Sequence, residues 1–218
     1  MTIKALIFDL GGVIVDLDFS KFFKEVIEVS PLHTPQSSLL LEFWRQSEIY
    51  HQGKITNEDF YNQACELLQV CALNKEEFFK SFNSVISHIN NDVLDLIKSL
   101  KKTKKYKLIL LSNVNESHWD YFINNFIKEK SEGDFVELFD DLLLSFQLFI
   151  TKPNQEIYQM AIRRAGCHPD EIVFIDDGLK NIHSAEELGI HSIRYTKLSE
   201  LRVELKKLGI ILEDINLS

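Results

Sequence analysis

Cysteine is scarce in this sequence, with only Cys65, Cys71 and Cys167 among 218 residues. The number is odd and the spacing fits no metal-binding pattern, so reduced thiols in a cytoplasmic protein are the simplest account. No apolar run approaches the ~20 residues that a membrane-spanning helix needs. No charged leader precedes an apolar segment at the start of the chain. These absences predict a soluble, cytoplasmic protein with no membrane partner.

Positive charge is also limited. The chain has 24 Lys and Arg against 33 Asp and Glu, which gives a formal net charge of −9. Because nucleic-acid phosphates require a basic face, this balance argues against a nucleic-acid partner. The one basic run, at 98–107, directly precedes a predicted strand and is interpreted as the solvated end of a helix. The sequence leaves the oligomeric state open.

Apolar residues make up 45% of the chain and form five short, β-branched runs, at 3–10, 107–112, 141–145, 171–176 and 191–195. Continuous rather than alternating hydrophobicity is typical of parallel strands that are covered on both faces. Helical patterns follow three of these runs, at 116–130, 154–165 and 179–188, with Gly166 and Gly189 at the expected helix ends and Pro153 near a helix start. This alternation predicts a doubly wound, Rossmann-like parallel α/β core with right-handed crossovers.

The segment between the first two runs has a different pattern. Residues 16–87 contain four helical patterns, at 19–29, 36–49, 57–70 and 75–86, and no convincing strand. Thr56 followed by Asp59 three positions later is typical of a helix N-cap. We therefore expect a small α-helical cap at 16–87, inserted into a core formed by 1–15 and 88–218.

Polar side chains follow four of the predicted strands. In open α/β sheets, ligands bind outside the carboxyl ends of the strands. The residues at these positions are Asp9, Ser112 with Asn113, Lys152, and Asp176 with Asp177. Taken singly, Asp9 and Lys152 are more often a helix cap or turn residue and a solvated side chain, Ser112 and Asn113 are turn formers, and a turn or helix N-cap remains an alternative for Asp176 with Asp177. Their common position at one sheet edge indicates a catalytic centre.

The acidic residues suit phosphoryl transfer. An Asp such as Asp9 can act as a nucleophile and form an aspartyl-phosphate that water later hydrolyses. Gly11 and Gly12 would let backbone N–H groups approach phosphate oxygens. Asp176 and Asp177 repel each other unless a cation lies between them or one is protonated, and Mg²⁺ fits that demand.

The neighbouring polar residues have complementary roles in this interpretation. The Lys152 ammonium would balance charge and orient the nucleophile. Ser112 and Asn113 would donate hydrogen bonds to a phosphate oxygen. His51, in a turn of the helical segment, is a candidate substrate contact.

Four motifs carry a resemblance to a known family. The segments IFDLGGVIVDLDF, LLSNVNESHWDYF, KPNQEIYQ and FIDDGLKNI are similar, in the right order, to the four motifs of the haloacid dehalogenase-like superfamily. They most resemble a phosphatase-like subgroup with a helical cap after the first motif. The resemblance spans nearly the whole chain. It implies that Asp9 is the nucleophile, Ser112 a phosphate ligand and Lys152 the charge-balancing lysine, and that Mg²⁺ binds Asp9, Asp176, the Gly11 carbonyl and, in an assisting role, Asp177.

The sequence departs from the family pattern at two positions. Gly11 stands where most phosphatases of the family have an Asp that acts as general acid and base, and losing such a group costs on the order of 10²–10⁴ in rate. A residue such as His51 would then have to supply the proton. Phe149 stands where Gly is common, which raises the question of whether Lys152 reaches the site. Asn115 and His118 on the core side are further candidate substrate contacts, and Asn181 would brace the metal site.

Three functions fit these residues. The first is a slow Mg²⁺-dependent phosphatase acting on a small phosphorylated metabolite such as a sugar phosphate. The second is a dehalogenase. Such an enzyme would need no metal and would have no pair of Asp residues at this position, so the presence of Asp176 and Asp177 argues against it. The third is a non-catalytic binding or scaffold protein, which Gly11 and Phe149 favour. Phosphorylated metabolites assayed with and without Mg²⁺ separate the three.

Overall fold

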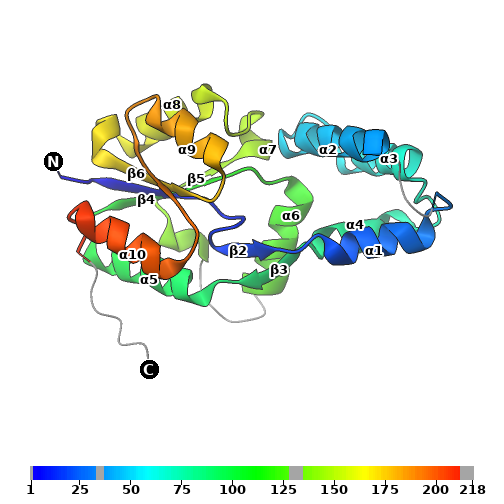
Figure 1. Ribbon diagram of the computed structural model, residues 1–218, viewed down its shortest axis with the longest axis horizontal. Helices are drawn as coiled ribbons and strands as arrows, with labels where there is room; N and C mark the ends of the chain where they lie inside the picture. The colour runs from blue at the N-terminus through cyan, green and yellow to red at the C-terminus, as the bar shows by residue number, and fades with distance from the viewer. Residues whose placement is uncertain (1, 33–36, 128–134, 212–218) are drawn as a thin grey trace.

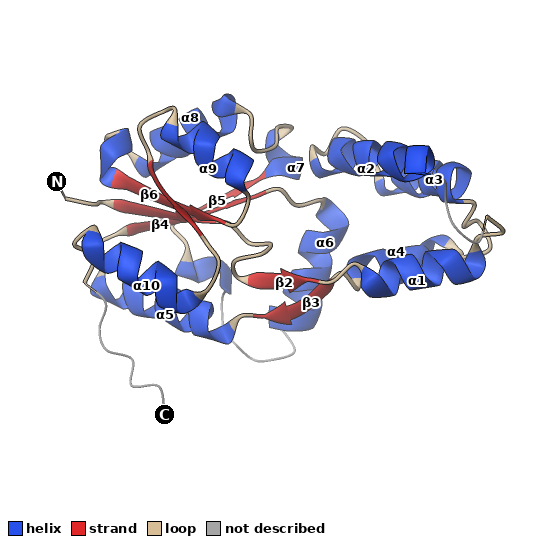
Figure 2. Ribbon diagram, viewed as in Figure 1, coloured by secondary structure: helices blue, strands red, loops and turns tan. Residues whose placement is uncertain are grey.

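The computed structural model describes residues 2–32, 37–127 and 135–211. Its centre is a five-stranded sheet in which all neighbouring strands are parallel (Figures 1 and 2). The spatial order is β5 (Asp141–Leu144), β4 (Lys107–Ser112), β1 (Ala5–Phe8), β6 (Ile172–Asp176) and β7 (His191–Arg194). The five apolar runs of the sequence are thus confirmed as strands of a doubly wound α/β core.

Helices cover both faces of this sheet (Figure 1). On one side lie α8 (Gln155–Ala165) and α9 (Leu179–Glu186), and on the other lie α5 (Asn91–Thr103) and α10 (Leu198–Lys207). Successive side chains of β1 point to opposite faces, as expected for a strand. Ala5 and Ile7 join the hydrophobic cluster that includes Ile157 of α8, whereas Leu6 and Phe8 join the cluster that includes Leu201 of α10. Burial on both faces explains why the sequence of this strand is apolar throughout.

A helical segment extends to one side of the sheet (Figure 2). It contains α1 (Ser20–Val29), α2 (Ser37–His51), α3 (Asn57–Leu68) and α4 (Lys75–Asn83). The capping box of Thr56 and Asp59 is present at the start of α3, and Asn74 with Glu77 forms a second one at the start of α4. The four helical patterns of the sequence are therefore confirmed, although Ile86 lies in a strand rather than in the fourth helix.

Two short strands join this segment to the sheet. β2 (Val15–Leu17) pairs antiparallel with β3 (Ile86–Ile89). The expectation that 16–87 contains no strand was wrong at both ends. The two strands were missed because each is only three or four residues long and Leu17 of β2 is exposed, so neither shows a clear alternation of apolar and polar residues. Their pairing also joins segments about 70 residues apart in the sequence.

Several boundaries differ from the sequence prediction. α6 (Glu116–Tyr121) continues as a π-helix (Phe122–Ile127), and positions 128–130 of the predicted helix lie outside the described residues, as does position 36. The basic run enters the last turns of α5, as expected. A four-residue helix α7 (Ser145–Leu148) follows β5, and 3₁₀ turns occur at Phe135–Leu138 and Pro169–Glu171. Among the described residues, no helix is long and apolar enough to cross a membrane.

Candidate active site

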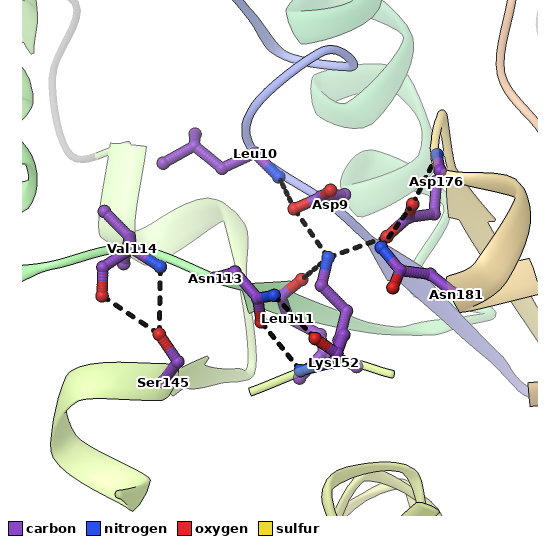
Figure 3. A network of polar contacts seen from close by, with 10 residues as sticks. Asp9, Leu10, Leu111, Asn113, Val114, Ser145, Lys152, Asp176 and Asn181 are labelled. Atoms are coloured by element: carbon purple, nitrogen blue, oxygen red, sulfur yellow. Dashed lines mark hydrogen bonds and ion pairs between the residues drawn. The ribbon is translucent and has the colours of Figure 1, made fainter. Parts of the chain in front are cut away.

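Lys152 lies at the carboxyl edge of the sheet, between two carboxylates (Figure 3). Its Nζ is 2.8 Å from Asp9 Oδ1 and 2.7 Å from Asp176 Oδ2, and it donates a third hydrogen bond of 3.0 Å to the Leu111 carbonyl. The side chain is 1% exposed, so the three donors of the ammonium are all satisfied inside the protein. The lysine thereby fixes the positions of the two carboxylates relative to each other.

Asn113 holds the main chain of Lys152. Its side-chain oxygen accepts a 2.8 Å hydrogen bond from the Lys152 N–H, and its amide donates one of 2.8 Å to the Lys152 carbonyl. Because Asn113 directly follows β4, these bonds attach the lysine loop to the end of that strand. We expected Asn113 to bind phosphate; the structure uses its oxygen and one amide hydrogen for positioning and leaves the second hydrogen for a ligand.

Phe149 does not displace Lys152. The residue has a φ of 59°, in the left-handed region that favours glycine, and this explains why Gly would fit the position well. Its side chain is 60% exposed and therefore stays out of the buried site. The lysine keeps its three contacts despite the bulky residue in the preceding loop.

Asp176 is held by donors from the start of the next helix. Its Oδ1 accepts a 2.8 Å hydrogen bond from the Gly178 N–H and one of 2.9 Å from Asn181 Nδ2. These bonds orient the carboxylate so that Oδ2 meets Lys152. Asn181 thus lies where the sequence predicts, bracing the acidic end of β6.

Gly12 has a steric role in the loop after β1. Its φ is 75°, and its N–H, which the sequence predicts to approach a phosphate, donates a 2.7 Å hydrogen bond to the Val15 carbonyl. A Cβ added at Gly12 would lie 2.3 Å from Asp177 Oδ2. Glycine is needed here because Asp177 packs directly against the backbone. Gly11 and the buried Ser112 do face a common pocket, as the phosphate-binding prediction requires.

The three carboxylates have different electrostatic environments. Burial, countered by Lys152 and reinforced by Asp176, raises the pKa of Asp9 to about 7. Burial also acts to raise the pKa of Asp176, but Lys152 and the hydrogen-bond donors outweigh it and hold this pKa below its ordinary value. Loss of solvent and then the charge of Asp176 raise the pKa of Asp177. The cluster as a whole therefore carries more negative charge than its single lysine balances.

These residues fit a divalent cation. Asp9, Asp176 and Asp177 each offer an oxygen, and these oxygens lie within 4.8 Å of one another. With all groups ionised, three carboxylates and Lys152 leave two uncompensated negative charges. Oxygen donors of this kind are the ligands that Mg²⁺ prefers. The structure thus brings together the three carboxylates that the sequence predicts as metal ligands.

His51 and His118 share Asn115 as a hydrogen-bond partner. The Asn115 amide lies 3.3 Å from His51 Nε2 and 3.0 Å from His118 Nδ1, and it donates to both rings. The opposite nitrogens face carbonyl oxygens, with His51 Nδ1 2.6 Å from Ser47 O and His118 Nε2 3.2 Å from Phe82 O. Burial lowers the pKa of His51, and burial together with His51 lowers that of His118 to about 3. A neutral His51 whose Nε2 accepts a hydrogen bond has no proton to give to a leaving group.

The end of α2 is attached to the core beside the site. The Ser145 hydroxyl donates to the His51 carbonyl at 2.6 Å, and Gln52 Nε2 donates to Thr151 Oγ1 at 3.2 Å. Thr151 directly precedes Lys152. The helical segment is thus connected to the core at the catalytic loop as well as through β2 and β3.

We expect Gly53→Ala to weaken this second attachment. Gly53 has a φ of 64°, and an added Cβ would lie 2.1 Å from the Phe146 carbonyl oxygen. Strain and overlap with main-chain atoms should lower the free energy of unfolding by about 2–4 kcal/mol. Gly166→Ala is the matched control, since its φ is 70° but nothing lies within 4 Å of the new Cβ. It should cost only about 1–2 kcal/mol. Equal losses in urea unfolding would show that α2 does not dock tightly at Phe146.

The fold and the site together define a class of hydrolase. A parallel α/β sheet carries a buried Asp–Lys–Asp cluster at its carboxyl edge, and a helical insertion follows the first strand. The family model of haloacid dehalogenase-like hydrolases matches residues 3–189, and the chain therefore belongs to this family.

Three relatives are similar to this chain over nearly its whole length. The chain is 32% identical to a D-ribitol-5-phosphate phosphatase of Bacteroides thetaiotaomicron over 93% of its length and 97% of the relative. A haloacid dehalogenase family enzyme of the same organism, solved with magnesium and inorganic phosphate, superimposes with a TM-score of 0.75 at 29% identity, covering 91% of this chain and 98% of that one. A family hydrolase from Porphyromonas gingivalis gives a TM-score of 0.76 at 26% identity, with 95% and 98% covered.

Proposed function

We propose that the chain is a Mg²⁺-dependent phosphatase that hydrolyses phosphate monoesters through an aspartyl-phosphate on Asp9. The observation that carries the proposal is the position of Asp9 between a buried ammonium and two further carboxylates. The Asp9 Oδ1 accepts a 2.7 Å hydrogen bond from the Leu10 N–H and lies 2.8 Å from Lys152 Nζ, and these contacts fix the orientation of the carboxylate.

The reaction follows from these groups. An Asp9 oxygen forms a bond to phosphorus while the ester P–O bond breaks, and the alcohol takes its proton from solvent because Gly11 has no acidic side chain. Water then attacks the phosphorus of the aspartyl-phosphate and releases inorganic phosphate and the free carboxylate. Mg²⁺, held by Asp9, Asp176, Asp177 and the Gly11 carbonyl, would neutralise the charge of the transferring phosphoryl group. Lys152 keeps Asp9 oriented throughout.

The helical segment would act as a cap in this function. We propose that 16–87 forms the cap and that 1–15 with 88–218 forms the catalytic core. His51, Ser47 and Trp44 of α2 line a pocket together with Gly11 and Ser112, which supports a role of the cap in substrate contact. The D-ribitol-5-phosphate phosphatase and the magnesium and phosphate complex among the relatives support a small phosphorylated metabolite as substrate and Mg²⁺ as cofactor.

Hydrolysis of acetyl phosphate and nitrophenyl phosphate, with and without Mg²⁺, tests this function. We expect Mg²⁺-dependent release of phosphate from both compounds and no enzymatic release after chelation. A folded protein that hydrolyses neither compound at any Mg²⁺ concentration would contradict the proposal and favour a binding or scaffold role. Hydrolysis that survives chelation would remove Mg²⁺ from the account.

Gly11→Asp should accelerate hydrolysis of unactivated esters. The new carboxyl group would protonate the departing alkoxide and later activate water, so we expect kcat on alkyl phosphates to rise on the order of 10²-fold. The backbone allows the change, since Gly11 has no positive φ and the atoms nearest its added Cβ belong to the exposed Leu17 side chain, with Cδ1 at 3.1 Å, which can move.

Gly11→Asn is the matched control for this gain. It has the same shape but no proton to exchange, so its rate should stay near that of the native protein. A gain for both variants, or for neither, would show that the missing carboxyl group does not limit the reaction.

A further inference from the structure

The pocket beside the catalytic centre is enclosed between the helical segment and the core. A small cavity of about 90 Å³, partly open to solvent, lies next to Gly11, Ser112 and Asn113. Because these three residues lie beside Asp9, at the end of β1, and beside the loop that carries Lys152, the rest of the pocket is available to the alcohol part of a phosphate ester.

The walls of this space are mainly apolar. Residues of β2, α2, α4, β3 and α6, which are far apart in the sequence, form these walls. The apolar side chains among them include Leu17, Phe19, Trp44, Phe82, Val85 and Val114. Phe19 and Trp44 pack edge to face with their ring centroids 5.4 Å apart. Trp44 and Leu17 remain 38% and 45% exposed, although both are large and apolar. A ligand with an apolar body would cover these side chains.

Most polar side chains of the pocket already form hydrogen bonds within the protein. Both ring nitrogens of His51 and of His118 have partners, through Asn115 and two carbonyl groups. The Asn113 amide holds Lys152 through its oxygen and one of its two hydrogens, which leaves one hydrogen for a ligand. A polyol placed here would give up hydrogen bonds to water and find few replacements, which is unfavourable for each buried hydroxyl.

We propose, on the basis of the phosphatase function above, that the substrate is the monophosphate of an apolar alcohol. The phosphate lies at Gly11 and Ser112, and the hydrocarbon part lies against Phe19 and Trp44. This substrate class differs from the sugar phosphate suggested by the sequence. Selectivity arises because the pocket gains from burying hydrocarbon and cannot satisfy the hydroxyls of a sugar.

Hexyl phosphate and sorbitol 6-phosphate form a matched pair for the test. Both are six-carbon esters of a primary alcohol, and they differ in the hydroxyls along the chain. With Mg²⁺ present, we expect kcat/KM for hexyl phosphate to exceed that for sorbitol 6-phosphate by at least about 10-fold. Equal values, or a preference for the sorbitol ester, would overturn the inference while leaving the phosphatase function intact. No hydrolysis of either ester or of acetyl phosphate would overturn the function itself.

Two variants on α2 test where the hydrocarbon part of the substrate binds. Trp44→Gln should lower kcat/KM for hexyl phosphate about 10-fold and should lower kcat/KM for acetyl phosphate, which lacks an extended body, by much less. Leu41→Gln makes a similar change at a residue that is 70% exposed on the same helix and does not line the pocket, and it should affect neither substrate. Loss of hexyl phosphate activity in both variants, or in neither, would contradict the assigned position of the hydrocarbon part.

Discussion

Replacing Asp9 by Asn should lower phosphate release by at least about 10³-fold and leave the fold intact. The amide has nearly the same shape but is a poor nucleophile, and the covalent step depends on a carboxylate oxygen. The fold should tolerate the change because the amide oxygen can still accept the hydrogen bonds that Leu10 N–H and Lys152 donate to Asp9 Oδ1. Lys152 would keep Asp176 and the Leu111 carbonyl as partners.

The control for this variant is Asp16→Asn. Asp16 is an exposed residue of β2, a few positions further along the same segment, and the structure assigns its side chain no part in the site. Its loss should leave turnover unchanged. Initial rates on acetyl phosphate, together with unfolding curves of both variants, make the measurement. Turnover of Asp9→Asn within a few-fold of the native protein would eliminate the proposed nucleophile.

Replacing Lys152 by Met should produce the largest loss of stability at any single charged residue described here. The ammonium is buried between Asp9 and Asp176, and removing it leaves two carboxylates close together without a counter-charge. Breaking a buried ion pair in this way costs about 3–5 kcal/mol. Activity should fall as well, because Asp9 loses the contact that orients it.

Two comparisons test whether the loss of stability in Lys152→Met comes from the uncompensated charge of the buried carboxylates. Lys4→Met removes an ion pair with Glu171 of similar length, 2.7 Å, in which the lysine side chain is 58% exposed, and it should change stability little. Mg²⁺ should restore part of the stability of Lys152→Met, because the cation supplies positive charge to the same carboxylates. Urea unfolding with and without Mg²⁺ measures both effects. A loss no larger than that of Lys4→Met would show that the buried pair is not a structural requirement.

The main features of the core could be predicted because they depend on local sequence. Strands covered on both faces need continuous apolar runs, so β1, β4 and β6 stand out in the sequence. Parallel strands place their carboxyl ends at one edge, and this brings together Asp9 and Asp176 from strands 160 or more residues apart. The chemistry of the cluster followed from residue types once that topology was inferred.

Other features depend on contacts that no local pattern indicates. The pairing of β2 with β3 joins segments about 70 residues apart, each too short to show periodicity. The hydrogen bond from the Gly12 N–H to the Val15 carbonyl belongs to a tight turn. The two adjacent glycines indicate a turn at this position, but they do not determine which hydrogen bonds it forms. Asn115 was a candidate for substrate binding, but in the fold its amide lies between His51 and His118.

The apolar pocket was missed for a related reason. Leu17, Trp44 and Phe82 are individually ordinary apolar residues, and nothing in their local sequence separates them from core positions. Only the folded arrangement leaves two of them partly exposed at the entrance of the same space. The sequence identified the catalytic end of the site, and the three-dimensional structure was needed for the substrate end.

The most direct test of the account is the detection of a phosphoryl group on Asp9. The Mg²⁺-loaded protein is mixed with acetyl phosphate, quenched in acid during turnover and digested, and the peptides are analysed by mass spectrometry. We predict that the peptide containing Asp9 gains the mass of one phosphoryl group, that the gain accumulates because Gly11 provides no base for its hydrolysis, and that it is absent from Asp9→Asn. Turnover without any phosphorylated Asp9 peptide, or a phosphoryl group on another residue, would contradict the central claim.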